Sequence, residues 1–101
     1  MKTRLGQPDR DAAETLAIRA LGFLARDGDR LGRFLSLTGI GPGELRGLAS
    51  DPALLGGVLE HLLGDETLLL VFATEEAVPP ADVALAHAAL TAPRAGAPRR
   101  F

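Results

Sequence analysis

Two histidines and their acidic neighbours are the first residues whose types could do chemistry. His61 and Asp65 are four residues apart, a spacing that places two side chains on one face of a continuous helix. With His87 they could supply three ligands for a metal ion. However, Gly64 interrupts the helix before Asp65, and His87 lies far along the chain. We therefore expect two partly exposed histidines, no metal site and no bound cofactor.

Nucleophilic and acid–base catalysis have little support in the sequence. Ser36 and Ser50 lack the G-x-S-x-G turn that presents a serine nucleophile, and the chain has no cysteine. The acidic pair Glu75-Glu76 does not form a catalytic dyad by itself, because adjacent residues on a helix do not face each other. The sequence therefore predicts a protein without enzymatic activity.

A glycine-rich segment offers an alternative, nucleic-acid function. Gly39-Ile40-Gly41-Pro42 is similar to the hairpin of helix-hairpin-helix DNA-binding modules, in which backbone N–H groups bind a phosphate. Arg46 could add a base contact. Yet Glu44 stands where the phosphate would approach, and no lysine follows the hairpin. We expect a structural turn with Ile40 in the core, and we keep DNA contact through Gly39, Ile40, Gly41 and Arg46 as the alternative.

Charge is unevenly distributed along the chain, although the net charge is only −2. Residues 1–50 hold eight basic and six acidic residues, residues 51–90 hold seven acidic and no basic residues, and residues 91–101 hold three arginines. Two solvated faces of different sign would explain this pattern. Alternatively, an acidic face meets a basic partner, or an arginine face meets an acidic one. The predicted protein-contact residues are Arg26, Arg30, Arg33 and Arg46, because arginine is enriched at interfaces.

Helical periodicity covers nearly the whole chain, and no alternating strand pattern occurs. The prediction is an all-α fold, a compact bundle of five to six short helices around a central buried helix. We expect that central helix at 65–77, because the run 68–72 is apolar on most sides. The other helices are expected at 11–26, 29–38, 42–49, 51–63 and 81–90.

Residues with capping preferences define the ends of these helices. Asp29 is expected to cap the second helix, and Gly28 to close the first in the left-handed conformation. Gly39 should end the second helix. Residues 1–10 are then a lead-in, 11–90 a single domain, and 91–101 a mobile basic tail rich in Pro, Ala and Arg.

Composition restricts the class of protein further. The 47% apolar content is too high for a disordered chain. The longest strictly apolar run, 68–73, is far too short to cross a membrane. The start of the chain leads into Asp9-Arg10-Asp11 and not into an apolar stretch, so no signal peptide is expected. We expect a cytoplasmic protein that binds another protein and not a membrane; the sequence does not identify the partner or the oligomeric state.

Several sequence blocks, taken in order, resemble a known family. They include Thr38-Gly39-Ile40, the segment Val58-Leu59-Glu60-His61-Leu62-Leu63 and the segment Leu68-Leu69-Leu70-Val71-Phe72-Ala73. The chain is similar, over roughly residues 12–90, to the domain of unknown function 3572 family of small alphaproteobacterial proteins. The resemblance implies the helical fold, and it implies no activity, cofactor or catalytic residue.

Overall fold

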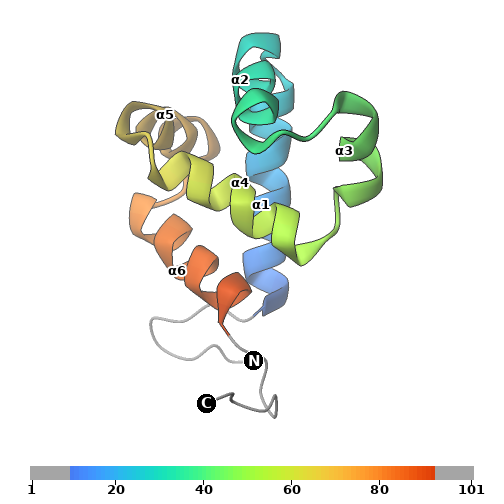
Figure 1. Cartoon of the computed structure of the whole chain (residues 1–101). Coiled ribbons are helices and arrows are strands. Elements are labelled where there is room, and N and C mark those ends of the chain that lie inside the picture. Colours follow the sequence, from blue (N-terminus) through green and yellow to red (C-terminus); the bar gives the residue numbers. More distant parts are fainter. Residues whose placement is uncertain (1–9, 93–101) are drawn as a thin grey trace.

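The computed structural model describes residues 10–92, which form six α-helices and no strand (Figure 1). The all-α prediction is therefore confirmed for this part of the chain. The helices are α1 (Arg10–Ala25), α2 (Gly28–Thr38), α3 (Pro42–Leu48), α4 (Pro52–Leu63), α5 (Glu66–Glu76) and α6 (Pro80–Thr91). The expected mobile tail falls mainly on residues outside the described range, and α6 extends one residue into it.

Short polar residues begin three of these helices. The side chains of Asp51 and Asp65 accept backbone N–H groups from Ala53 and Leu68, at 2.8 and 3.1 Å, and so cap α4 and α5 as their positions in the sequence indicate. The cap of α2 differs from the prediction. Asp27, not Asp29, accepts the N–H groups of the first turn.

The predicted role of Gly28 is therefore wrong. Gly28 is the first residue of α2 and has no positive φ, while α1 ends after Ala25. The carboxylate of Asp27 accepts hydrogen bonds from the backbone N–H groups of Asp29 and Arg30, so α2 begins immediately after Asp27. Gly39, by contrast, ends α2 with a φ of 77°, a left-handed conformation that glycine adopts at little cost.

The central buried helix is α4, and the expectation that 65–77 occupies this place is wrong. Six of the twelve residues of α4 are buried, whereas α5 buries only Phe72 and Ala73. Leu70 of α5 is 48% exposed, and Leu69 is half-buried. α4 instead packs against both α1 and α6, which also contact each other (Figure 1).

Small residues allow these helices to approach closely. Three alanines of α1, Ala13, Ala17 and Ala20, are fully buried along one face. On α4, a Cβ at Gly56 would lie 3.4 Å from Cγ2 of Thr91, so this glycine faces α6 at contact distance. Gly56 thus allows α6 to approach α4 closely.

α5 is joined to α1 by one aromatic contact and one cluster of charges. The rings of Phe23 and Phe72 meet edge to face, with centroids 5.3 Å apart. Beside them, Glu76 accepts hydrogen bonds from Arg26, at 2.9 Å, and from Arg19, at 3.2 Å. The hydrogen bond from Arg26, together with that from Arg19, lowers the pKa of the Glu76 carboxyl.

Candidate functional site

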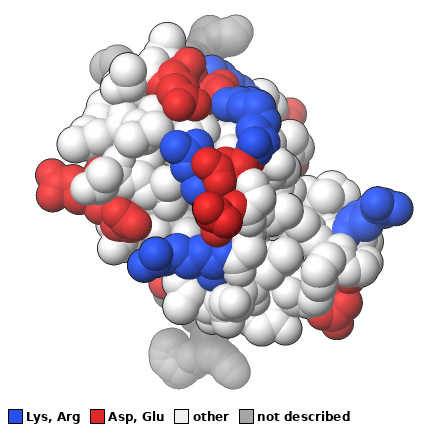
Figure 2. Space-filling model, turned by 90° about the horizontal axis from the view of Figure 1, so that it is seen from above, with Lys and Arg blue, Asp and Glu red and all other residues white. Residues whose placement is uncertain are grey.

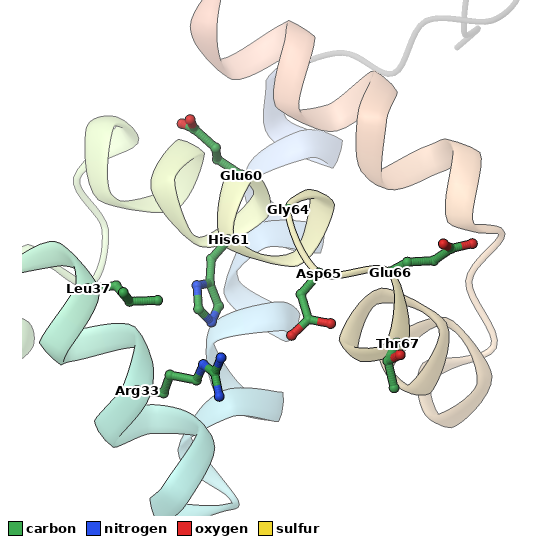
Figure 3. Close-up of a pocket in the computed structure, with 8 residues that line it drawn as sticks. All are labelled: Arg33, Leu37, Glu60, His61, Gly64, Asp65, Glu66 and Thr67. Carbon is green, nitrogen blue, oxygen red and sulfur yellow. The ribbon is translucent and has the colours of Figure 1, made fainter.

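A hollow of about 470 Å³ lies between α2 and the turn that joins α4 to α5 (Figure 3). A smaller one of about 180 Å³ shares three of its residues, Arg33, His61 and Asp65. Figure 3 shows these three side chains directed toward one another from different elements. The remaining residues that line the larger hollow are Leu37, Glu60, Gly64, Glu66 and Thr67.

α2 contributes an arginine and a leucine one helical turn apart. Arg33 is exposed, and within residues 10–92 its guanidinium group forms no ion pair and no hydrogen bond. Leu37 follows four residues later, on the same side of the helix, and its exposed fraction is 69%, the largest among the exposed large apolar residues of this part of the chain. The pair gives α2 a cationic and apolar outer surface.

Acidic side chains occupy the opposite wall. Asp65 is fixed there, because its Oδ1 accepts the N–H of Leu68 as the cap of α5. Its carboxylate does not come within ion-pair distance of Arg33, although both line the same hollow. Glu60 and Glu66 also line the hollow, but Figure 3 shows their side chains directed away from Arg33, and the Glu60 carboxylate lies near His87 of α6.

His61 lies at the floor of the hollow. Its ring meets that of Phe34 edge to face at 5.2 Å, and its Nε2 is buried without a hydrogen-bond partner among the described residues. Burial lowers the pKa of His61, the Asp65 carboxylate raises it and the Arg33 guanidinium lowers it further, with a net decrease. His61 is therefore neutral near pH 7.

The four arginines predicted to contact a partner lie in different environments. Arg26 is bound to Glu76, and the Arg30 guanidinium lies 4.5 Å from the centre of the Phe23 ring. Arg33 lines the hollow, and Arg46 is exposed on α3. Two of the four thus already have side-chain contacts within the chain, whereas Arg33 lines the hollow beside Leu37 without an ion pair.

A side chain of the protein is hydrogen-bonded to the backbone of the glycine hairpin. The N–H of Gly41 donates to Oε1 of Glu44 at 2.8 Å, so this backbone donor of the hairpin is already paired with a carboxylate. Ile40 is half-buried and packs against the core, as expected for a structural turn. This geometry favours the structural interpretation over the DNA-contact alternative.

Folding also redistributes the charge blocks of the sequence. Arg19 and Arg26, from the first half of the chain, pair with Glu76 from the acidic half. Figure 2 shows basic and acidic side chains interleaved over the face that it presents. On that face the blocks do not form two separate fields of opposite sign.

The two histidines do not come together. His87 lies on α6, where its Nε2 is 3.9 Å from Oε1 of Glu60, and both histidines are half-buried, as expected. No group of three or more His, Asp or Glu side chains within residues 10–92 could hold a metal ion. None of the six described helices is both long and apolar enough to pass through a bilayer.

Sequence reasoning missed the pairing of His61 with Phe34 and the exposure of Leu37. The apolar face of α2 carries Phe34, and Leu37 lies three residues beyond it, off that face. The exposure of Leu37 could have been predicted, because the helical periodicity places this apolar residue outside the core-facing side of the helix.

Six short helices, of which α4 is the most deeply buried, form a small all-α domain with a mixed-charge hollow beside α2. The chain belongs to the family described as "protein of unknown function (DUF3572)", whose sequence model matches residues 10–93. No curated protein and no solved structure matches the chain.

Proposed function

We propose that this protein is a non-catalytic interaction module that binds another protein through the outer side of α2. The observation that carries the proposal is the pair Arg33 and Leu37, an arginine without an intramolecular partner beside a leucine that is 69% exposed. Arginine and buried apolar side chains supply much of the binding energy at protein interfaces. Arg30, which lines the smaller hollow together with Arg33, would lie next to this pair.

The chemistry of this surface describes the partner it would suit. An apolar side chain of the partner would cover Leu37, and a carboxylate would pair with Arg33. The chain has no cysteine, so its stability does not depend on an oxidising compartment, which is consistent with a cytoplasmic role.

The test compares two leucine variants in quantitative pull-downs from extract of the source cell. Leu37→Ser removes the exposed leucine of α2, and Leu85→Ser removes one that is 37% exposed on α6. We expect at least one protein to be retained by the wild type and by Leu85→Ser, and to be lost with Leu37→Ser and Arg33→Gln. If the retained proteins are the same for all four baits, α2 is not the contact surface.

Thermal melts of each bait accompany the pull-down. Leu37 is exposed, so its replacement should cost under about 1 kcal/mol of stability, as surface substitutions do. Partner loss with an intact melting transition then reports on binding. An enzymatic turnover found for the purified protein would contradict the non-catalytic part of the proposal.

A further inference from the structure

We propose that the hollow between α2 and the α4–α5 turn binds a small zwitterion of the α-amino-acid type, with its carboxylate on Arg33 and its ammonium on Asp65. The argument begins with two opposite charges that line one hollow without neutralising each other. A ligand that carries a negative and a positive charge a few ångströms apart can pair with Arg33 and with Asp65 at the same time. An anion alone would be repelled by the Asp65 carboxylate, which faces Arg33 across the hollow (Figure 3).

Asp65 is held in place for this role. Its Oδ1 is committed to the N–H of Leu68, at 3.1 Å, so the carboxylate cannot turn toward Arg33 without losing the cap of α5. Its Oδ2 has no hydrogen-bond donor within the described residues. An ammonium group has three N–H donors and can supply the missing one.

The floor of the hollow contains a second polar atom without a hydrogen-bond partner among the described residues. Nε2 of His61 is buried and lacks a hydrogen-bond partner among residues 10–92, which is unfavourable for a polar atom. Arg33 is a long, exposed side chain, and its guanidinium can move toward a bound carboxylate and uncover this nitrogen. In the neutral tautomer that carries its proton on Nδ1, Nε2 is an acceptor and can then receive a second N–H of the ammonium.

The rim indicates the kind of side chain that the ligand carries. Leu37 is 69% exposed at the edge of the larger hollow, and Leu68 lines the smaller one. Apolar contact with these residues removes surface from water and favours an aliphatic amino acid. A volume of about 470 Å³ accommodates such a molecule.

The experiment is a titration followed by two-dimensional NMR of the ¹⁵N-labelled full chain with three probes. L-Leucine carries both charges, leucinamide only the cation, and N-acetyl-leucine only the anion. We expect L-leucine to shift the amide signals of Arg33 and of residues 64–67. The two single-charge probes should bind at least about tenfold more weakly, as the loss of a charge-assisted hydrogen bond implies.

Conservative variants localise the site. Asp65→Asn keeps a residue that can cap α5 but removes the charge, and Arg33→Gln removes the guanidinium. Each should weaken L-leucine binding about tenfold or more, while Arg46→Gln and Asp82→Asn leave it unchanged. The proposal is overturned if L-leucine causes no shift at its solubility limit, if all three probes bind alike, or if the control variants lose as much.

This outcome is separable from the proposed protein interaction. Asp65 lies on the wall opposite α2 and outside the proposed partner contact, so Asp65→Asn should leave the Leu37-dependent partner bound. If amino-acid binding is absent while that partner is retained, only the ligand site is refuted.

Discussion

Replacement of Leu59 by alanine tests whether α4 is the centre of the fold. Leu59 is fully buried in a helix that packs against both α1 and α6. A Leu→Ala change at such a position costs about 2–5 kcal/mol, because apolar contacts are lost and a cavity remains. Small domains have a total stability of roughly 5–15 kcal/mol, so about 3 kcal/mol is a large share of it. For a domain of this size each kcal/mol shifts the melting temperature by about 4–8 °C, which predicts a decrease of roughly 10–25 °C.

The matched control is Leu70→Ala in α5. Leu70 is 48% exposed, so its truncation leaves no closed cavity and should cost less than about 1 kcal/mol. Thermal melts and urea titrations followed by circular dichroism at a helix band measure both variants. Equal losses for the two variants, or a larger loss for Leu70→Ala, would refute the assignment of α4 as the central helix and restore the α5-centred arrangement.

Three further predictions concern local conformation and pH. Gly57→Ala should raise the free energy of unfolding by about 0.5–1 kcal/mol, because a Cβ at this helical position meets nothing within 4 Å. Gly39→Ala should lower the free energy of unfolding by about 1–2 kcal/mol, because the φ of Gly39 is +77°. A urea titration that gives both changes the same sign would contradict this. Asp51→Ala should cost about 1 kcal/mol through loss of the cap of α4, and an unchanged urea midpoint would show that the cap contributes nothing. The pKa of His61 is below its ordinary value of 6.5 in the folded state, so the unfolded chain takes up more protons and stability should fall as the pH drops below 6.5. His61→Gln should flatten that decrease, and an identical pH profile for both proteins would exclude His61 as its cause.

The starts of the helices and one of the stops could be predicted from neighbouring residues alone. Asp51 followed by proline begins α4, Asp65 begins α5, and Gly39 ends α2, as the sequence indicates. These signals depend on hydrogen bonds that span two or three residues, so they act before any tertiary contact is made. The start of α2 is the exception, because Asp27 and Asp29 are both able to cap a helix and the sequence does not distinguish them.

The hollow could not be predicted, because its walls come from separate elements. Arg33 is a surface arginine in the sequence, and Asp65 is a helix cap; only the packing of α2 beside the α4–α5 turn brings them to one place. The same holds for Glu76, which meets Arg26 across fifty residues of chain. Such pairs depend on how the helices are arranged, and side-chain spacing along one helix does not contain that information.

The sequence by itself determined that this protein is helical, where most of its helices begin, and which family it belongs to. The tertiary structure decided which helix lies at the centre. The longest uninterrupted apolar run, 68–73, lies in α5, but α4 is the more apolar helix as a whole, and α4 is the one that packs against both α1 and α6. An uninterrupted apolar run is a property of one segment, whereas burial depends on which helix surfaces meet in the folded chain and how closely they pack.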